Sequence, residues 1–372
     1  MVYFDNAATS HLTPKVIERM TQVMSQVFGN PSSLHQDGRK ANQLLRQCRQ
    51  ELAQALAVKD NQLIFTSGGT ESNNLAIKGY ALANQDKGKH LITTSVEHHS
   101  VLHTMSYLET CGFEVTYLEP INQTISAQQV KEALRPDTIL VSIMYANNET
   151  GDVYPIEEIG TLLTEHQAVF HVDAIQVIGK LSVHPQELHI DLLSASAHKF
   201  HGPKGCGFLY HNTLKLTPLL HGGQQENNRR ASTENLIGIA GMTTALLDCL
   251  AKEKENLAQI YGLKASFLKQ LDQLGVNYYL NQGANSLPYV LSLGFPETNN
   301  ALLLTQLDLA GFSLSAGSAC TTGNIEPSHV LASYYGKTSP RLKEVIRISF
   351  SEYNTLAEVL ALAQILKKVI KH

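Results

Sequence analysis

Short apolar segments alternate with helical segments through the middle of the chain, and this alternation constrains the fold more than any other feature. Each apolar segment has the length of a buried strand and is followed by a polar turn and a stretch of helical periodicity. The predicted strands are 63–66, 90–94, 138–145, 168–172 and 191–196. Strands that alternate with helices form a mostly parallel sheet with helices on both faces. We therefore predict an α/β fold that binds its ligand beyond the carboxyl ends of the strands.

The pattern changes near residue 250, which suggests two domains. Before this point a long helix is predicted over 39–58, where apolar residues follow helical spacing. The elements predicted after it are a charged helix from Lys252, strands at 289–293 and 345–350, and a final helix from about Thr355. We expect a large domain over 16–250 and a smaller α+β domain built from 1–15 together with 251–372.

The composition excludes several classes of protein. The chain has 372 residues, of which 17% are charged, and its formal net charge is −4. This balance argues against nucleic acid or a membrane surface as a partner, and no apolar run is long enough for a membrane-spanning helix. The five scattered cysteines form no metal-binding motif, which predicts free thiols in a reducing compartment. The start of the chain also lacks the features of a signal peptide, so we expect a cytoplasmic location.

One lysine follows the strand predicted over 191–196. Lys199 stands among hydroxyl and imidazole side chains and is followed closely by a glycine-proline loop. A surface lysine needs no such setting. A lysine that forms a Schiff base with an aldehyde cofactor must instead be desolvated and held at a strand end. We therefore expect Lys199 to bind pyridoxal phosphate (PLP).

Two glycines separate a predicted strand from a predicted helix in segment 66–74. In such a turn, backbone N–H groups at the helix start bind anions, and the helix adds a partial positive charge. Gly69 and the hydroxyl of Thr70 are therefore candidates for binding a phosphate group. An ordinary turn with a helix cap explains the same residues equally well.

Three polar residues also stand at or just after predicted strands. His98 is placed to stack on a planar cofactor and to move protons, but a capping or core histidine is the simpler role, and a metal site lacks a third ligand. Asp173 needs a cationic partner such as a pyridinium nitrogen, although a helix cap is an equal alternative. Gln176, three residues further on, is placed to hydrogen-bond the phenolic oxygen of the same ring.

Two residues of the C-terminal part are further candidates for a functional role. Cys320 is flanked only by Ser, Ala, Gly and Thr, on no apolar helix face and no predicted strand. We expect a mobile, exposed loop in which this thiol is reactive, although a loop cysteine without a role is the alternative. Arg347 stands between isoleucines on a predicted strand and needs an anion, either a substrate carboxylate or a buried acidic side chain.

Eight motifs in order along the chain resemble those of one family. They are SGGTESNN, VEHHSV, MYANNETG, FHVDAIQ, SASAHKFHGPKG, RRASTEN, SAGSACTTG and IRIS. Together they resemble the cysteine desulfurases of the NifS/IscS type, which are class-V aminotransferases and PLP enzymes of fold type I. The resemblance runs from Tyr3 to the last predicted strand. It implies a mostly parallel sheet of seven strands flanked by helices, with a smaller domain beside it.

The resemblance also implies a role for each matching residue. Lys199 would carry PLP, His98 would stack on its ring and assist proton transfer, and Cys320 would be the nucleophile. The residues that would hold the cofactor are Gly69, Thr70, His98, Asn148, Asp173, Gln176, Ser196, His198 and Lys199, with Thr233 reaching the cofactor of the partner subunit. The residues that would bind the substrate are Asn30, Asn148 and Arg347. No metal is implied.

The implied reaction converts L-cysteine to L-alanine and leaves the sulfur on Cys320 as a persulfide. The implied partners are a second copy of the chain, in a homodimer, and a protein that accepts the sulfur for iron–sulfur cluster assembly or tRNA thiolation. A selenocysteine lyase and an aminotransferase of the same fold are the alternatives, although an aminotransferase has no need of Cys320. The chain departs from the family at Ser351 and Glu352, where Gly-Arg is usual.

Overall fold

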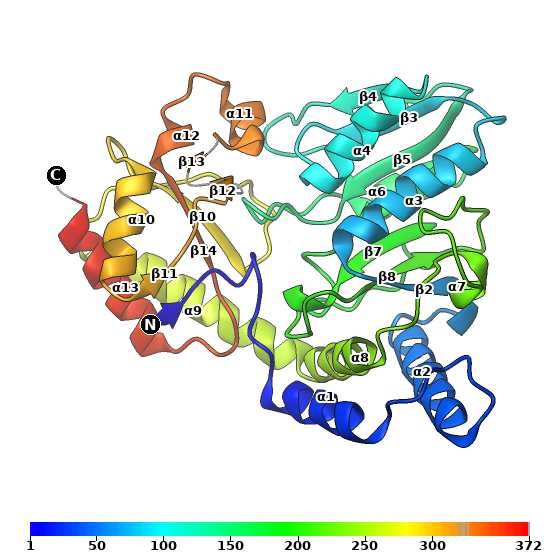
Figure 1. The fold of residues 1–372 in the computed structure, drawn as a ribbon. Helices are drawn as coiled ribbons and strands as arrows, with labels where there is room; N and C mark the ends of the chain where they lie inside the picture. Colours follow the sequence, from blue (N-terminus) through cyan, green and yellow to red (C-terminus); the bar gives the residue numbers. More distant parts are fainter. Residues whose placement is uncertain (318–319, 322–323, 326, 371–372) are drawn as a thin grey trace.

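The structure is a computed structural model that describes residues 1–317, 320–321, 324–325 and 327–370, with only the backbone for 320–321 and 324–325. Figure 1 shows a larger lobe built on one sheet and a smaller lobe that contains the two chain ends. Helix α8 (Leu236–Ala251) lies against the larger lobe, and α9 (Glu253–Gln273) continues from it into the smaller one. No helix among the described residues is long and apolar enough to cross a membrane.

Seven strands form the central sheet, in the order β2-β8-β7-β6-β5-β3-β4. Their bounds are β2 (Leu63–Thr66), β3 (His90–Thr94), β4 (Glu114–Leu118), β5 (Thr138–Met144), β6 (Val169–Asp173), β7 (Leu192–Ser196) and β8 (Gly207–His211). All pairings are parallel except those of β8, which runs antiparallel to β2 and β7. The prediction of a mostly parallel α/β sheet is confirmed.

Helices cover both faces of this sheet. Those of the larger lobe before α8 are α1 (Pro14–Gln26), α2 (Gln36–Ala55), α3 (Gly69–Ala83), α4 (His99–Thr110), α5 (Ala127–Ala133), α6 (Ile156–Leu163) and the short α7 (Gln225–Asn228), with one-turn 3₁₀ segments at η1 (Asp60–Gln62) and η2 (Ala197–Lys199). Successive strand residues point to opposite faces. Ile64 therefore joins the core under α3 and α4, whereas Phe65 joins the core under α1, α2, α6 and α8.

Helix α2 lies three residues earlier than the helix predicted over 39–58. It begins after His35, whose Nδ1 accepts a hydrogen bond from the backbone N–H of Gly38 at 3.3 Å. It ends before Ala57, whose φ of 54° is left-handed and does not continue a helix. Five of the apolar residues used for the prediction are buried on this helix, whereas Ala55 is partly buried and Leu56 follows the last helical residue. The five are Ala41, Leu44, Leu45, Cys48 and Leu52.

The smaller lobe has a hydrophobic core of its own. Its elements are β9 (Tyr279–Leu280), β10 (Val290–Gly294), α10 (Asn300–Leu309), β11 (Phe312–Ser313), α11 (His329–Tyr335), α12 (Arg341–Glu344), β14 (Val345–Ser349) and α13 (Leu356–Val369). The N-terminal strand β1 (Val2–Tyr3) pairs with β11, and the Phe4 ring packs against Phe312 and Phe350. The domain boundaries near residues 15 and 250 stay a prediction.

The backbone of Cys320 and Thr321 is extended. Strand β12 (Cys320–Thr321) pairs antiparallel with β13 (Asn324–Ile325). The prediction that Cys320 lies on no strand is therefore wrong. Two β-branched residues, Thr321 and Ile325, take part in this pairing, and such residues favour extended backbone. The side chain of Cys320 lies outside the described residues.

Candidate active site

A cavity of about 430 Å³ lies at the carboxyl ends of neighbouring strands. The register aligns these ends, because Asp173 of β6 pairs with Met144 of β5 on one side and with Ser194 of β7 on the other. Residues far apart in the sequence meet there, as expected for a parallel sheet. The site residues predicted from the sequence that line the cavity are Gly69, Thr70, His98, Asn148, Asp173, Gln176, Ser196, His198, Lys199 and Arg347.

Lys199 lies in η2, directly after β7, and its amine is buried. Its Nζ donates hydrogen bonds to the carbonyl oxygens of Ala7 at 2.6 Å and Ala8 at 2.7 Å. Burial lowers the pKa of Lys199 to about 7, and the nearby cation of Arg347 acts in the same direction. A substantial fraction of the amine is therefore neutral near neutral pH, which suits a nucleophile or a base.

Asp173 and His98 belong to one hydrogen-bonded network. The amide nitrogen of Asn73 donates to Asp173 Oδ2 at 2.7 Å and to Ser100 Oγ at 2.9 Å. The backbone N–H of Ser100 donates to His98 Nδ1 at 3.1 Å, so a neutral His98 ring carries its proton on Nε2. Burial raises the pKa of Asp173 and lowers that of His98. Sequence analysis assigned no role to Asn73, although it lies on α3 within the first quoted motif.

The start of helix α3 forms one wall of the cavity. Gly68 precedes it with a φ of 144°, a conformation that residues with a side chain rarely adopt. At Gly69 an added Cβ would lie 2.2 Å from Ile175 Cδ1, so a larger residue would crowd the wall. Thr70 and Ser196 line the same cavity, and Ser196 Cβ lies 3.5 Å from the position of a Cβ added at Gly69. The first backbone N–H groups of a helix are oriented to bind an anion at this place.

Arg347 meets an acidic side chain as well as the cavity. Its Nη2 donates to Asp5 Oδ1 at 2.7 Å, and its Nη1 donates to the carbonyl oxygen of Asn148 at 2.7 Å. Its Nε is buried and has no hydrogen-bond partner among the described residues. Both interpretations of this arginine therefore describe part of its surroundings: an internal ion pair is present, and a donor remains for a further anion. Sequence analysis missed Asp5, which also lines the cavity.

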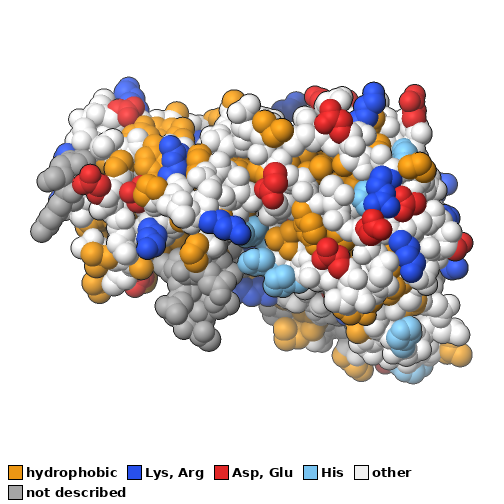
Figure 2. All heavy atoms as spheres, turned by 90° about the horizontal axis from the view of Figure 1, so that it is seen from above, with side chains coloured by type: hydrophobic (Ala, Val, Ile, Leu, Met, Phe, Trp, Pro, Cys, Tyr) orange, Lys and Arg blue, Asp and Glu red, His pale blue; other side chains and the backbone are white. Residues whose placement is uncertain are grey.

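Two residues that follow Cys320 in the sequence, Ser328 and His329, contact the larger lobe. Ser328 caps α11, and its hydroxyl donates to Glu149 Oε2 at 2.5 Å. Burial raises the pKa of Glu149. The next residue, His329, bonds to the carbonyl oxygen of Glu97 at 2.9 Å, and its ring packs against that of His99 with the centroids 4.8 Å apart. Figure 2 shows histidine side chains gathered near the middle of one face of the molecule.

Two predicted residues, Asn30 and Thr233, do not line this cavity. Asn30 is exposed, and its Oδ1 accepts a hydrogen bond from the backbone of Ser32. Thr233 lines a separate cavity of about 230 Å³. Cys320 Sγ lies outside the described residues. The predicted role of Thr233 is toward the cofactor of a partner subunit, and the role of Asn30 in substrate binding stays a prediction.

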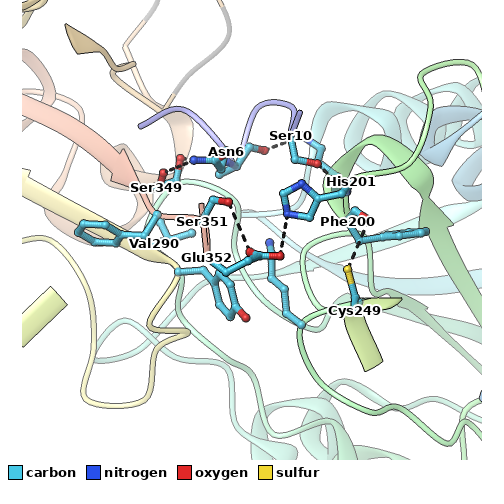
Figure 3. Close-up of a pocket in the computed structure, with 15 residues that line it drawn as sticks. Asn6, Ser10, Phe200, His201, Cys249, Val290, Ser349, Ser351 and Glu352 are labelled. Atoms are coloured by element: carbon cyan, nitrogen blue, oxygen red, sulfur yellow. Dashed lines mark hydrogen bonds and ion pairs between the residues drawn. The ribbon is translucent and has the colours of Figure 1, made fainter. Parts of the chain in front are cut away.

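A smaller cavity of about 20 Å³, the size of a water site, lies beside Lys199 between the two lobes. Figure 3 shows His201 and Glu352 pointing toward each other across it, and their Nε2 and Oε1 atoms are 3.2 Å apart. Glu352 is one of the two residues that depart from the family pattern. Here this residue links the C-terminal part of the chain to the loop after Lys199.

The chemistry of the residues around the cavity of about 430 Å³, the main cavity below, fits PLP. Asp173 is buried without a cation in ion-pair contact among the described residues, which is the place a pyridinium nitrogen would fill. His198 Nδ1 is buried without a hydrogen-bond partner among the described residues. Lys199 supplies a desolvated amine. These groups lie around one volume in the range of ordinary small-molecule sites.

Comparison with known proteins gives the family. The model of the class-V aminotransferases matches residues 2–362. Cysteine desulfurase IscS of Dictyoglomus turgidum is 45% identical over 335 residues, which are 89% of this chain and 85% of that protein. A solved NifS-like protein is 34% identical with a TM-score of 0.92, and the match covers 99% of this chain and 98% of that one. A structure of SspA in complex with cysteine is 37% identical with a TM-score of 0.83, covering 95% and 100%. The chain belongs to the class-V aminotransferases, PLP enzymes of fold type I, and within them to the cysteine desulfurases of the NifS/IscS type.

Proposed function

We propose that this protein is a PLP-dependent cysteine desulfurase that transfers sulfur from L-cysteine to Cys320. One observation carries the proposal: the amine of Lys199, the carboxylate of Asp173 and the guanidinium of Arg347 converge on a single cavity. Cysteine is also the ligand named for the SspA structure, which resembles this chain closely.

The residues around the cavity divide into groups that suit different parts of PLP. We assign Asp173 to the ring nitrogen, His98 to the ring face and Gln176 to the phenolic oxygen, and all three residues line the cavity. The residues for the phosphate are Gly69, Thr70, Ser196, His198 and Thr233 of the partner subunit. When bound, PLP supplies an electron sink that stabilises negative charge on the substrate α-carbon.

Lys199 is the base of the reaction. Its Nζ takes the α-proton of the substrate once the amine is free, and the lowered pKa keeps a neutral amine available near pH 7. His98 holds a proton on Nε2, because its Nδ1 accepts from Ser100, and it delivers a proton beside the ring face.

Arg347 and Asn148 orient the substrate. The unpartnered Nε of Arg347 donates to the α-carboxylate, and Asn148 lies beside it in the cavity wall. Cys320 then attacks the substrate sulfur. An S–S bond forms to Cys320 and the C–S bond of the substrate breaks, so the carbon skeleton keeps the electron pair, takes up a proton and leaves as L-alanine.

The working form is a homodimer that passes the sulfur to another protein. Thr233 and Asn30 lie away from the main cavity of their own chain, which supports a role across a subunit interface. The acceptor is a protein of iron–sulfur cluster assembly or tRNA thiolation. The free thiols of Cys48, Cys111, Cys206 and Cys249 suit a cytoplasmic location.

Borohydride reduction tests the cofactor part of this proposal. The purified protein incubated with PLP should gain a visible absorption band that borohydride bleaches, and peptide mapping should find the cofactor on Lys199. Lys204→Ala is the matched control, since that exposed lysine lies outside the cavity. The same preparation should release L-alanine from L-cysteine. A protein without the band, or one that forms no alanine, contradicts the proposal.

A further inference from the structure

A second lysine is buried close to Lys199, and the proposed chemistry does not use it. Lys180 is 8% exposed and lines the small cavity beside Lys199. The preceding residue, Gly179, has a φ of 81°, and an added Cβ would lie 2.3 Å from Phe200 Cβ. A turn of this kind requires glycine. It brings the Lys180 side chain back over Gln176, four residues earlier.

Lys180 donates both of its described hydrogen bonds to the same residue. Its Nζ lies 2.9 Å from the backbone oxygen of Gln176 and 3.1 Å from Oε1 of the Gln176 side chain. The ammonium group also lies 5.5 Å from the centre of the Tyr289 ring. Burying an ammonium group is costly unless acceptors meet it. These contacts therefore tie Lys180 closely to Gln176.

The contacts determine which way the Gln176 amide faces. A lysine ammonium has only donors, so the atom that faces Lys180 must be the oxygen. The NH₂ group then points the other way, and Nε2 donates to the carbonyl oxygen of Ala7 at 3.1 Å. That carbonyl is an acceptor, so both ends of the amide agree. An NH₂ group has two hydrogens, and Ala7 is its single acceptor among the described residues, which leaves one N–H for the main cavity that Gln176 lines.

We propose that Lys180 is a positioning residue that fixes the amide of Gln176 with its NH₂ group toward the PLP site. The inference rests on the proposed function, because Gln176 is placed there for the phenolic oxygen of PLP. Without Lys180 the amide is free to rotate by 180° and to present its oxygen to another oxygen, which is repulsive.

Lys180 also contributes charge to its surroundings. Burial lowers the pKa of Lys180 to about 8, and the carboxylate of Glu352 opposes this shift. Arg347 lowers the pKa further and Cys249 raises it, both with smaller effects. In turn, the Lys180 cation helps to lower the pKa of Lys199. An experiment on Lys180 must therefore separate its effect through Gln176 from its effect as a charge.

The test is a double-mutant cycle on the PLP-loaded enzyme, read from the pH midpoint of its visible absorption band rather than from activity. A donor to the phenolic oxygen favours the deprotonated form of the chromophore and lowers this midpoint. Lys180→Met should therefore raise it by about one pH unit, and Gln176→Met should raise it similarly. In the double variant, Lys180→Met should add little to the shift of Gln176→Met. Lys264→Met, at a partly buried lysine outside both cavities, should leave the midpoint unchanged.

A second variant keeps the inference testable if Lys180→Met does not fold. Gln176→Glu preserves the shape and the contact with Lys180 but cannot donate toward PLP, so it should also raise the midpoint. The inference is overturned if Gln176→Glu leaves the midpoint unchanged, or if Lys180→Met shifts it equally with and without Gln176. A wild-type protein that gains no visible band with PLP would instead refute the proposed function.

Discussion

Arg347 Nη2 and Asp5 Oδ1 lie 2.7 Å apart, although the two residues are separated by 342 positions in the sequence. The contact joins the N-terminal segment to the last strand at the edge of the cavity. It also places a protein carboxylate on the arginine that we assign to the substrate carboxylate.

The variant Asp5→Asn tests whether these two carboxylates compete. Removing the negative charge of Asp5 should lower KM for L-cysteine about fivefold and leave kcat within about twofold, since binding rather than chemistry changes. Asp248→Asn is the control, because Asp248 pairs with lysines on the surface. Steady-state kinetics gives both constants. A rise in KM would mean that Asp5 supports Arg347 instead of competing with the substrate.

The pKa of Lys199 predicts how turnover depends on pH. Burial lowers this pKa to about 7, and only the neutral amine removes a proton. With saturating L-cysteine, kcat should therefore fall about tenfold per unit as the pH drops below that value. The measurement is kcat across a pH series. A kcat that stays constant down to about pH 5.5 would contradict the assignment of Lys199 as the base.

His171 predicts how stability depends on pH. It lies fully buried in β6 between the hydroxyls of Ser142 and Ser194, and burial lowers its pKa to about 3. An unfolded histidine titrates near 6.5. The contribution of His171 to the free energy of unfolding is thus complete above about pH 6.5. It is lost progressively as the pH falls toward 3, at about 1.4 kcal/mol per pH unit.

Urea unfolding of the PLP-loaded protein at several pH values checks this sign. His171→Phe, which cannot take up a proton, should reduce the loss of stability between about pH 6.5 and 5. His184→Gln should not, because His184 is an exposed surface residue. The slope with pH matters here, not the absolute free energy of unfolding. Equal slopes for wild type and His171→Phe would contradict the claim that the buried neutral ring of His171 makes stability depend on pH.

Two glycines in helices should respond in opposite ways to alanine. At Gly69 an added Cβ would meet Ile175 in the cavity wall, so Gly69→Ala should weaken PLP binding about tenfold. At Gly262 in α9 nothing lies within 4 Å of the added Cβ. Gly262→Ala should therefore raise the free energy of unfolding by about 1 kcal/mol and leave PLP affinity unchanged. A PLP titration and an unfolding curve for each variant decide both points.

The residues that sequence analysis could place share a local signal. Lys199, Asp173 and His98 each stand at or just after a predicted strand, and a parallel sheet brings such positions to one edge. The contact of Lys180 with Gln176 was also open to prediction, because Lys180 follows Gln176 by four residues and a glycine stands between them. Burial of its amine was not visible in the sequence, because it depends on Tyr289 and the second lobe.

Other contacts depend on partners far away in the chain. Ser328 and Glu149 are 179 positions apart, and neither residue type alone indicates that they pair. The antiparallel strand β8 went unpredicted because it follows β7 after the one-turn segment η2 and a loop, without the α-helix that follows a strand in a strand–helix–strand unit. Asn30 and Thr233 were assigned by family resemblance, and both roles stay predictions; the role predicted for Thr233 involves the cofactor of a second subunit.

The central claim is that sulfur moves from L-cysteine to Cys320. Its most direct test is to incubate the PLP-loaded protein briefly with L-cysteine, alkylate the thiols, and map the peptides by mass spectrometry while alanine is measured in the same sample. We predict one additional sulfur atom on Cys320, none on Cys111, and alanine in matching amount, with all three lost in Lys199→Ala. Alanine release with an unmodified Cys320, undiminished in Cys320→Ser, would contradict the account.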